Sequence, residues 1–286
     1  MTSAVWEFCR KLFLVAALAF VVLPIAWMLI TSFKVPNEIS TTNPVFVPSA
    51  PTLDNYRAAL GIAIDERDLS ITVASRGAGR SYVRSVVTAG VTTVLVVVLA
   101  TPAGYALARI RVRGRSVVGQ NVLFARVLPP ATIALPLFAQ FSAMRLIDTP
   151  AALIALYLGS TLPFAVWTLM AFIGELPIEV EEAAFVDGAS VIQMLWRVVV
   201  PVLAPAVVAV AVITFALCFN EFFMALIFTR VHWLTFPVQT AAMIGTGGTP
   251  WGPMTAAGVI GLVPPLLTLL VGRRYLVQGL SLGAVK

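Results

Sequence analysis

The densest group of acidic side chains lies between residues 175 and 201. This segment reads ELPIEVEEAAFVDG and continues ASVIQMLWRVVVP. Its acids suit the positive end of a helix that begins near Pro177, and Asp187 with Gly188 suits the end of that helix. Ser190 and Gln193 have the spacing of a capping box, which starts a helix. The segment therefore predicts a short helix, a turn and a second helix that closes at Pro201.

This hairpin is suited to docking rather than to bond making. Ala183 and Ala184 keep one patch of it small, so that a partner can approach the backbone closely within a groove. The other interpretation is a surface loop whose acids, Glu179, Glu181 and Glu182, are merely solvated.

Catalytic and metal-binding constellations are not evident in the rest of the sequence. The lysines are Lys11, Lys34 and Lys286, and none follows the glycine-rich turn that cradles phosphates in ATP-hydrolysing proteins. His232 has no second ligand at metal spacing. We therefore expect that the chain is not an enzyme and that it binds no metal or cofactor itself.

The elements that must position the hairpin are membrane helices. The sequence is 59% hydrophobic and only 11% charged, whereas about a quarter of a soluble domain is charged. In a bilayer every backbone amide must be bonded internally, so each long uncharged stretch is expected to be a helix. The predicted fold is all-α, a single transmembrane domain over residues 1–286. Its six or so predicted spans are 12–31, 86–108, 117–144, 149–174, 202–228 and 252–272.

The positions of the basic residues predict the orientation of these spans. On one side, the short loops hold Arg10, Lys11 and the four arginines between residues 109 and 115. On the other side they hold only Arg145 and Arg230. Because positive charge favours the cytoplasmic side, both termini and the 175–201 loop are expected there, and the long 33–81 loop is expected outside. The net charge of +6 then needs no nucleic-acid partner.

Polar groups at membrane depth are costly and mark candidate functional positions. Arg126 and Glu221 lie within predicted spans, and Asn220 adds a neutral hydrogen-bonding group. One hypothesis is that Asn220 and Glu221 face a translocation cavity or a partner subunit, and the other is that they bond to helices inside the bundle. A pair between Arg126 and Glu221 is a further hypothesis, which the sequence leaves open.

The hairpin carries the spacing of a known signature. Its EAA triplet at 182–184, the glycine at 188 and the Val-x-Val-Pro ending at 198–201 resemble the EAA loop of ABC importer permeases, whose usual ending is Ile-x-Leu-Pro. In that family this loop is the coupling helix, which seats in a cleft of the ATP-binding subunit. The resemblance implies a docking site made of Glu182, Ala183, Ala184, Asp187, Gly188 and Pro201.

Motifs outside the hairpin resemble one subfamily, the MalG-like carbohydrate permeases. They follow the expected order along most of the chain: SFK at 32–34, PTLDNY at 51–56, LPP at 128–130, LPFAVW at 162–167, NEF at 220–222 and the tail from Gln278 to Lys286. The family often has tryptophan directly before its Asn-Glu-Phe, whereas this chain has Phe219. That departure bears on any ring-stacking role of Phe219 in the translocation pathway.

The resemblance implies the permease subunit of an ATP-driven importer for a carbohydrate or a related polar solute, in the cytoplasmic membrane of a bacterium. The implied partners are a MalF-like second permease, two subunits that bind ATP and Mg²⁺, and an extracytoplasmic solute-binding protein. Alternating access would then be driven through the coupling loop. The alternative is a proton-coupled secondary transporter, which should show an internal repeat and needs no docking loop.

Overall fold

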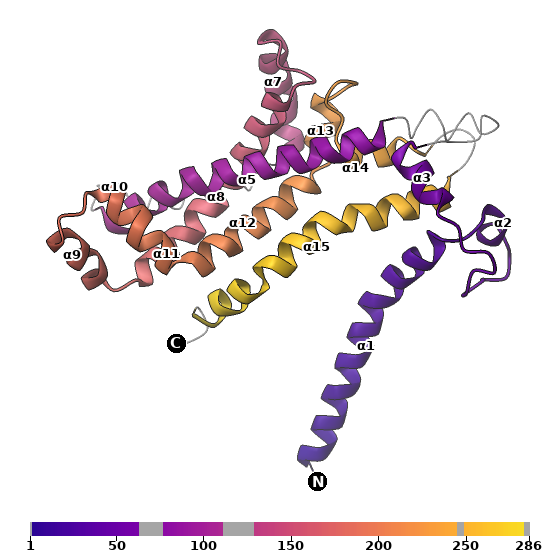
Figure 1. The fold of residues 1–286 in the computed structure, drawn as a ribbon, viewed down its shortest axis with the longest axis horizontal. Helices are drawn as coiled ribbons and strands as arrows, with labels where there is room; N and C mark the ends of the chain where they lie inside the picture. Colours follow the sequence, from indigo (N-terminus) through magenta and orange to yellow (C-terminus); the bar gives the residue numbers. More distant parts are fainter. Residues whose placement is uncertain (1, 63–76, 111–128, 245–248, 283–286) are drawn as a thin grey trace. The chain divides into compact units, whose positions relative to one another are not determined.

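The computed structural model describes residues 2–62, 77–110, 129–244 and 249–282. In these ranges the regular elements are helices, and no strand occurs among them (Figure 1). The predicted all-α class is therefore confirmed. The chain divides into two compact units, residues 1–80 with 239–262 and residues 81–238 with 263–286.

A buried asparagine, Asn55, connects the helices of the first unit. It contains α1 (Thr2–Thr31), α2 (Pro36–Ile39), α3 (Asp54–Leu60) and the first part of α15 (Trp251–Leu282). The side-chain amide of Asn55 donates to the carbonyl of Ser32 at 3.0 Å and to that of Lys34 at 2.7 Å. A Cβ at Gly252 would overlap the side chain of Asn55, so α15 approaches this residue closely only because position 252 is glycine. The SFK and PTLDNY motifs are thus in direct contact.

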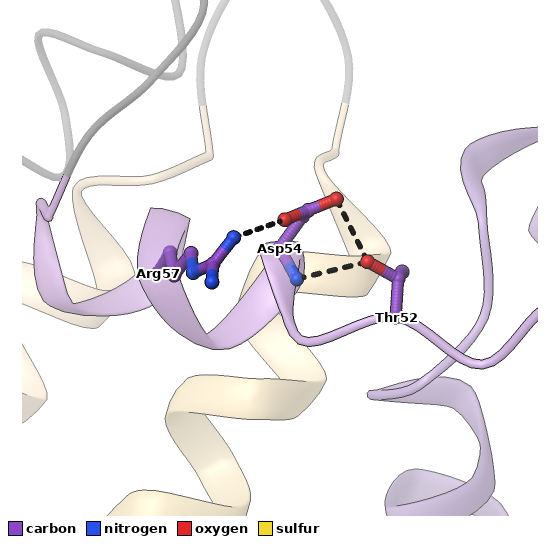
Figure 2. Close-up of polar contacts among 3 residues, drawn as sticks. All are labelled: Thr52, Asp54 and Arg57. Carbon is purple, nitrogen blue, oxygen red and sulfur yellow. Dashed lines mark hydrogen bonds and ion pairs between the residues drawn. The ribbon is translucent and has the colours of Figure 1, made fainter.

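The start of α3 is held by a small polar network (Figure 2). The Thr52 hydroxyl accepts a hydrogen bond from the Asp54 amide at 3.1 Å and donates to the Asp54 carboxylate at 2.7 Å. Arg57 binds the other oxygen of that carboxylate at 3.2 Å. The Thr52 amide also donates to the carbonyl of Phe33 at 2.9 Å. These bonds fix the helix that carries Asn55 against the end of α1.

The second unit is a helical bundle. Its longer helices are α8 (Pro150–Glu175), α12 (Ala204–Phe219) and most of α5 (Ala78–Arg109). Of these, α8 and α12 lie side by side (Figure 1). The shorter helices are α7 (Pro130–Ala143), α13 (Phe223–Phe228) and most of α14 (Phe236–Ala241). At Gly104 a Cβ would lie 3.1 Å from the backbone nitrogen of Met170, so α5 and α8 pack nearly backbone to backbone there.

Several helices have the length and apolar composition of a membrane span. In the described ranges they are Val5–Thr31, Ala78–Arg109, Pro150–Glu175 and Trp251–Tyr275, and the pair Val191–Val202 and Ala204–Phe219 adds a fifth if it is counted as one span bent by 82°. Residues 117–128 of the predicted third span, with Arg126, lie outside the described residues, so the count of six stays a prediction.

The stretch predicted as the fifth span, 202–228, is not one helix. α12 ends at Phe219 and α13 begins at Phe223, so Asn220 to Phe222 form a break. The apolar composition on both sides of the break concealed it in the sequence.

Candidate functional site

The segment 175–201 forms a helical hairpin at one end of α8 and α12 (Figure 1). Its first helix is α9 (Ile178–Val186), and its second part comprises α10 (Val191–Met194), a π-helical turn (Leu195–Val199) and α11 (Val200–Val202). The predicted helix, turn and helix are therefore confirmed, and the second part ends one residue beyond Pro201.

The turn has the chemistry that the sequence indicated. Gly188 has a φ of 83°, a backbone conformation that glycine adopts without strain. The Ser190 hydroxyl accepts from the Gln193 amide at 3.4 Å, and the Gln193 side chain accepts from the Ser190 amide at 3.0 Å. The predicted capping box is therefore present. It starts the second part of the hairpin at a defined residue.

A buried ion pair fastens the hairpin to α5. The Glu181 carboxylate accepts from Nε of Arg109 at 2.6 Å through one oxygen and from the Tyr105 hydroxyl at 2.8 Å through the other. Arg109 also donates to the carbonyl of Leu176 at 2.5 Å, between α8 and α9. The Glu181 side chain is only 3% exposed. Both charges are thus paired and hydrogen-bonded, which is the condition under which a buried ion pair is tolerated.

The anchoring role of Glu181 was not predicted from the sequence, where Glu181 stands with Glu179 and Glu182 near the helix start. Glu181 and Ala184 are nevertheless one helical turn apart and share the buried face. The helical period was therefore the signal that separates Glu181 from its neighbours. The partner residue, Arg109, was assigned only an orientation role.

The opposite face of the hairpin is open. Of the predicted docking residues, Glu182, Ala183, Asp187, Gly188 and Pro201 are exposed, whereas Ala184 is buried in the core of its own chain. Apolar side chains accompany these exposed residues: Val186 is 87% exposed and Ile192 is 71% exposed. Exposed apolar side chains rimmed by acids are typical of an interaction surface.

A cavity of about 500 Å³ lies among α7, α8, α12 and the start of α13. Its described lining includes Glu221 as the one charged residue, with Tyr157, Ser160 and Thr161 as polar neighbours. The two oxygens of Glu221 accept from the amides of Met224 at 2.9 Å and Ala225 at 3.1 Å. Glu221 therefore both faces a cavity and caps α13. That this cavity serves translocation, or that Glu221 faces a partner subunit, stays a hypothesis.

The residues beside Glu221 point elsewhere. The Asn220 side chain donates to the carbonyl of Ala216 at 2.9 Å and does not line the cavity. Phe219 is buried, with its ring stacked on Phe215 at 6.1 Å between centroids and in edge contact with Tyr82. Only Glu221 of these three residues faces the cavity. The hypothetical pair with Arg126 concerns a residue outside the described ranges.

A second carboxylate organises the end of the bundle remote from the hairpin. Asp148, in the turn between α7 and α8, accepts hydrogen bonds from the four consecutive amides of residues 230–233, at 2.7 to 3.0 Å. The Asp148 amide donates in turn to the carbonyl of Phe228 at 2.9 Å. Burial alone would raise the pKa of Asp148, but these four hydrogen bonds together outweigh it and lower the pKa from 3.8 to about 2.

We expect Asp148→Asn to lower the free energy of unfolding by about 2 kcal/mol at neutral pH, because an amide offers one acceptor oxygen where the carboxylate offers two. The folded-state pKa of Asp148 is depressed, so its stabilisation is present above about pH 4 and is lost as the pH falls toward 2. Denaturation of the purified protein between about pH 2 and pH 7 measures both effects. Asp187→Asn, at an exposed carboxylate, is the control. An unchanged acid transition in Asp148→Asn would contradict the assignment.

The arrangement as a whole is suited to binding and movement. In the described part of the chain, no group of three or more side chains could hold a metal ion. What the described helices do present is an exposed face with apolar side chains on a fastened hairpin, and a cavity with one carboxylate in its described lining.

Comparisons with known proteins identify the family. Residues 100–281 match the family described as "Binding-protein-dependent transport system inner membrane component". The chain is 32% identical to the trehalose/maltose transport system permease protein MalG of Thermococcus litoralis, over 92% of this chain and 91% of that protein. It is 33% identical to the trehalose transport system permease protein SugB of Mycobacterium tuberculosis, over 93% of each.

A solved structure shares the fold. It is the crystal structure of a bacterial ABC transporter involved in the import of the acidic polysaccharide alginate, and one of its chains matches with a TM-score of 0.76 at 20% identity, over 96% of this chain and 98% of that one. The family match covers the hairpin, the cavity and the Asp148 cluster, and the two relatives extend over nearly the whole chain. With its several apolar helices, this chain therefore belongs to the family of multi-pass inner membrane components of binding-protein-dependent transport systems, the ABC importer permeases, as its sequence motifs predicted.

Proposed function

We propose that this chain is a permease subunit that moves an uncharged carbohydrate across the cytoplasmic membrane, driven by ATP hydrolysis on a partner. The observation that carries the proposal is the hairpin, which is fastened to α5 through Glu181 while its far face stays open. A fastened hairpin passes a displacement into the bundle, because Arg109 lies at the end of a long helix. A solvated loop has no reason to be fastened.

The proposed docking face is the exposed side of the hairpin. Val186 and Ile192 supply apolar contact area, and Glu182 and Asp187 supply negative charge around it. The surface that fits is an apolar groove with basic residues at its rim, on an ATP-binding subunit. Gly188 has open space where a Cβ would lie, so a side chain there would meet the partner rather than this chain. Ala184 contributes by packing the hairpin on its own core.

The proposed cargo follows from the relatives and the cavity. The names of both permease relatives mention trehalose, which supports a carbohydrate. The cavity lining pairs the hydroxyls of Ser160 and Thr161 with the carboxylate of Glu221, groups that exchange hydrogen bonds with sugar hydroxyls. The negative charge of Glu221 favours an uncharged solute over an anionic one. A supporting role is proposed for Asn220 and Phe219, whose contacts with Ala216 and Phe215 hold the end of α12 beside the cavity. A role of Arg126 in the pathway stays a hypothesis.

The proposed assembly is one copy of this chain, a MalF-like permease, two ATP-binding subunits that hold ATP and Mg²⁺, and an extracytoplasmic solute-binding protein. Both termini and the hairpin are assigned to the cytoplasm. Arg10 and Lys11 in the first part of α1 and Arg109 at the end of α5 support that orientation.

The docking assignment is tested by recovery of the ATP-binding subunit with this chain. With all subunits co-expressed and this chain tagged, Val186→Asp should reduce the recovered ATP-binding subunit at least about tenfold, because a buried unpaired charge costs several kcal/mol at an interface. Val47→Asp, which changes a similarly exposed valine in the first outer loop, should leave recovery unchanged. Equal recovery with Val186→Asp and the wild type would refute docking through this face.

A further inference from the structure

A pocket of about 440 Å³ in the first unit lies at the junction of α1 with the first outer loop. Its lining runs from Pro24 in α1 to Val45 in the loop and includes Trp27 and, from α15, Trp251. Neither the docking face nor the Glu221 cavity involves these residues. Several buried polar atoms of this pocket lack a direct partner among the described residues.

Lys34 is buried in this pocket and makes no direct ion pair with any residue that the structure describes. It is only 1% exposed, and its ammonium lies 3.9 Å from the centre of the Trp27 ring. Among the described residues, no carboxylate lies within ion-pair distance of Lys34. The carboxylate of Glu38, in the same pocket, interacts with the Lys34 charge from farther away. A buried ammonium with no anion in direct contact is unfavourable. The side-chain amide of Asn55 donates to the Lys34 carbonyl, which fixes the backbone at this position. The position therefore favours an anion from outside the chain.

Two further polar atoms of the pocket lack hydrogen-bond partners within the described ranges. They are the hydroxyl oxygen of Thr31 and one carboxylate oxygen of Glu38, both buried. The other oxygen of Glu38 accepts from the amide of Ser49 at 2.9 Å and from its hydroxyl. These hydrogen bonds, chiefly that of the Ser49 hydroxyl, lower the pKa of Glu38, so the carboxylate is charged at neutral pH. The pocket thus offers a cation, a hydroxyl donor and an anionic acceptor.

The surroundings of these atoms match a lipid headgroup region. Thr31 is the last residue of α1, which is long and apolar enough to span a membrane. Tryptophans such as Trp27 and Trp251 are enriched where a span leaves the hydrocarbon. Pro24 lies seven residues before Thr31, so the apolar wall of the pocket continues about 10 Å down the helix. A ligand with a polar head at Lys34 and an apolar tail along α1 fits this shape.

We propose that this pocket binds a phosphoethanolamine group, supplied by the membrane lipid phosphatidylethanolamine. The phosphate accepts from the Lys34 ammonium and the Thr31 hydroxyl, and the ethanolamine ammonium donates to the free oxygen of Glu38. Each polar atom left unpaired in the pocket then has a partner. The lipid would join α1 to the loop that begins at Lys34.

The test uses the delipidated, purified transporter complex in maltoside micelles, with single lipids added back. Phosphatidylethanolamine should be retained in native mass spectra and should raise the unfolding temperature. Retention should fall at least about tenfold in Lys34→Gln and in Glu38→Gln, since each variant removes one charge-assisted contact. Lys11→Gln is the matched control, because Lys11 is an exposed lysine in α1, the helix that precedes Lys34 in the chain. The unfolding temperature without lipid shows whether each variant is folded.

Other ligands distinguish the source and the chemistry. Soluble phosphoethanolamine at millimolar concentration tests whether the headgroup alone suffices: stabilisation by the lipid only assigns a lipid site, and stabilisation by both supports the group from either source. Phosphatidylglycerol has a phosphate but no ammonium, so equal retention of it would overturn the assignment of Glu38. Equal retention of phosphatidylethanolamine by Lys34→Gln and the wild type, or none by the wild type, would overturn the site.

Discussion

Arg109→Met should lower the free energy of unfolding by about 3–5 kcal/mol, because it leaves the Glu181 carboxylate buried without its cation. The Tyr105 hydroxyl alone cannot compensate a charge that is 3% exposed. The hairpin should detach from the end of α5, so ATP hydrolysis by the complex should continue with little solute moved. Denaturation of the purified protein and the ratio of solute transported to ATP hydrolysed measure the two effects.

The double variant Arg109→Met with Glu181→Leu separates charge burial from mechanical fastening. Replacing both partners with apolar side chains removes the buried charge, so stability should return to within about 1–2 kcal/mol of the wild type. Transport should recover in proportion if an apolar contact also fastens the hairpin. Arg273→Met removes an exposed arginine near the end of α15 and serves as the control. Equal stability of Arg109→Met and the control would contradict the role of the ion pair.

Glu221→Ala should have the second largest effect. It removes the acceptors of two amides, those of Met224 and Ala225, at a break inside an apolar segment. Leaving these donors unpaired should cost about 2–4 kcal/mol of stability. The variant should also transport little, because the cavity loses its charged group.

Glu221→Gln distinguishes capping from solute binding at the same position. Glutamine keeps an acceptor oxygen for α13, so stability should change by no more than about 1 kcal/mol. Uptake of trehalose or maltose should nevertheless fall about tenfold, because a charge-assisted hydrogen bond to the sugar is lost. Thr93→Val is the control, since the Thr93 hydroxyl bonds to Ala89 within its own helix. Normal uptake by Glu221→Gln would remove Glu221 from the pathway and leave it a structural cap.

The sequence was most informative where local chemistry determines local structure. The capping box at Ser190, the break at Gly188 and the apolar spans depend on residues close in the chain, and each was predictable. The family was predictable too, because its motifs keep their order along the chain.

Contacts between distant residues were not predictable from one sequence. Glu181 and Arg109 are 72 positions apart, and the residues around either one do not indicate which distant residue it contacts. The same holds for Asp148 and the amides of residues 230–233, because almost every residue has a backbone amide and the residue type does not show which amide is a donor here. The break after Phe219 was missed for a related reason: Glu221 makes it possible by capping α13, but a single acid within an apolar run was interpreted only as a charge at membrane depth.

Uptake by reconstituted vesicles tests most directly whether work from a separate ATPase reaches this chain. The complete complex, with solute-binding protein and labelled trehalose or maltose outside, should accumulate sugar when ATP is enclosed and not when ADP is enclosed. Vesicles that lack the ATP-binding subunits should accumulate none, with or without an imposed proton gradient. Accumulation by this chain alone, without nucleotide, would contradict the account.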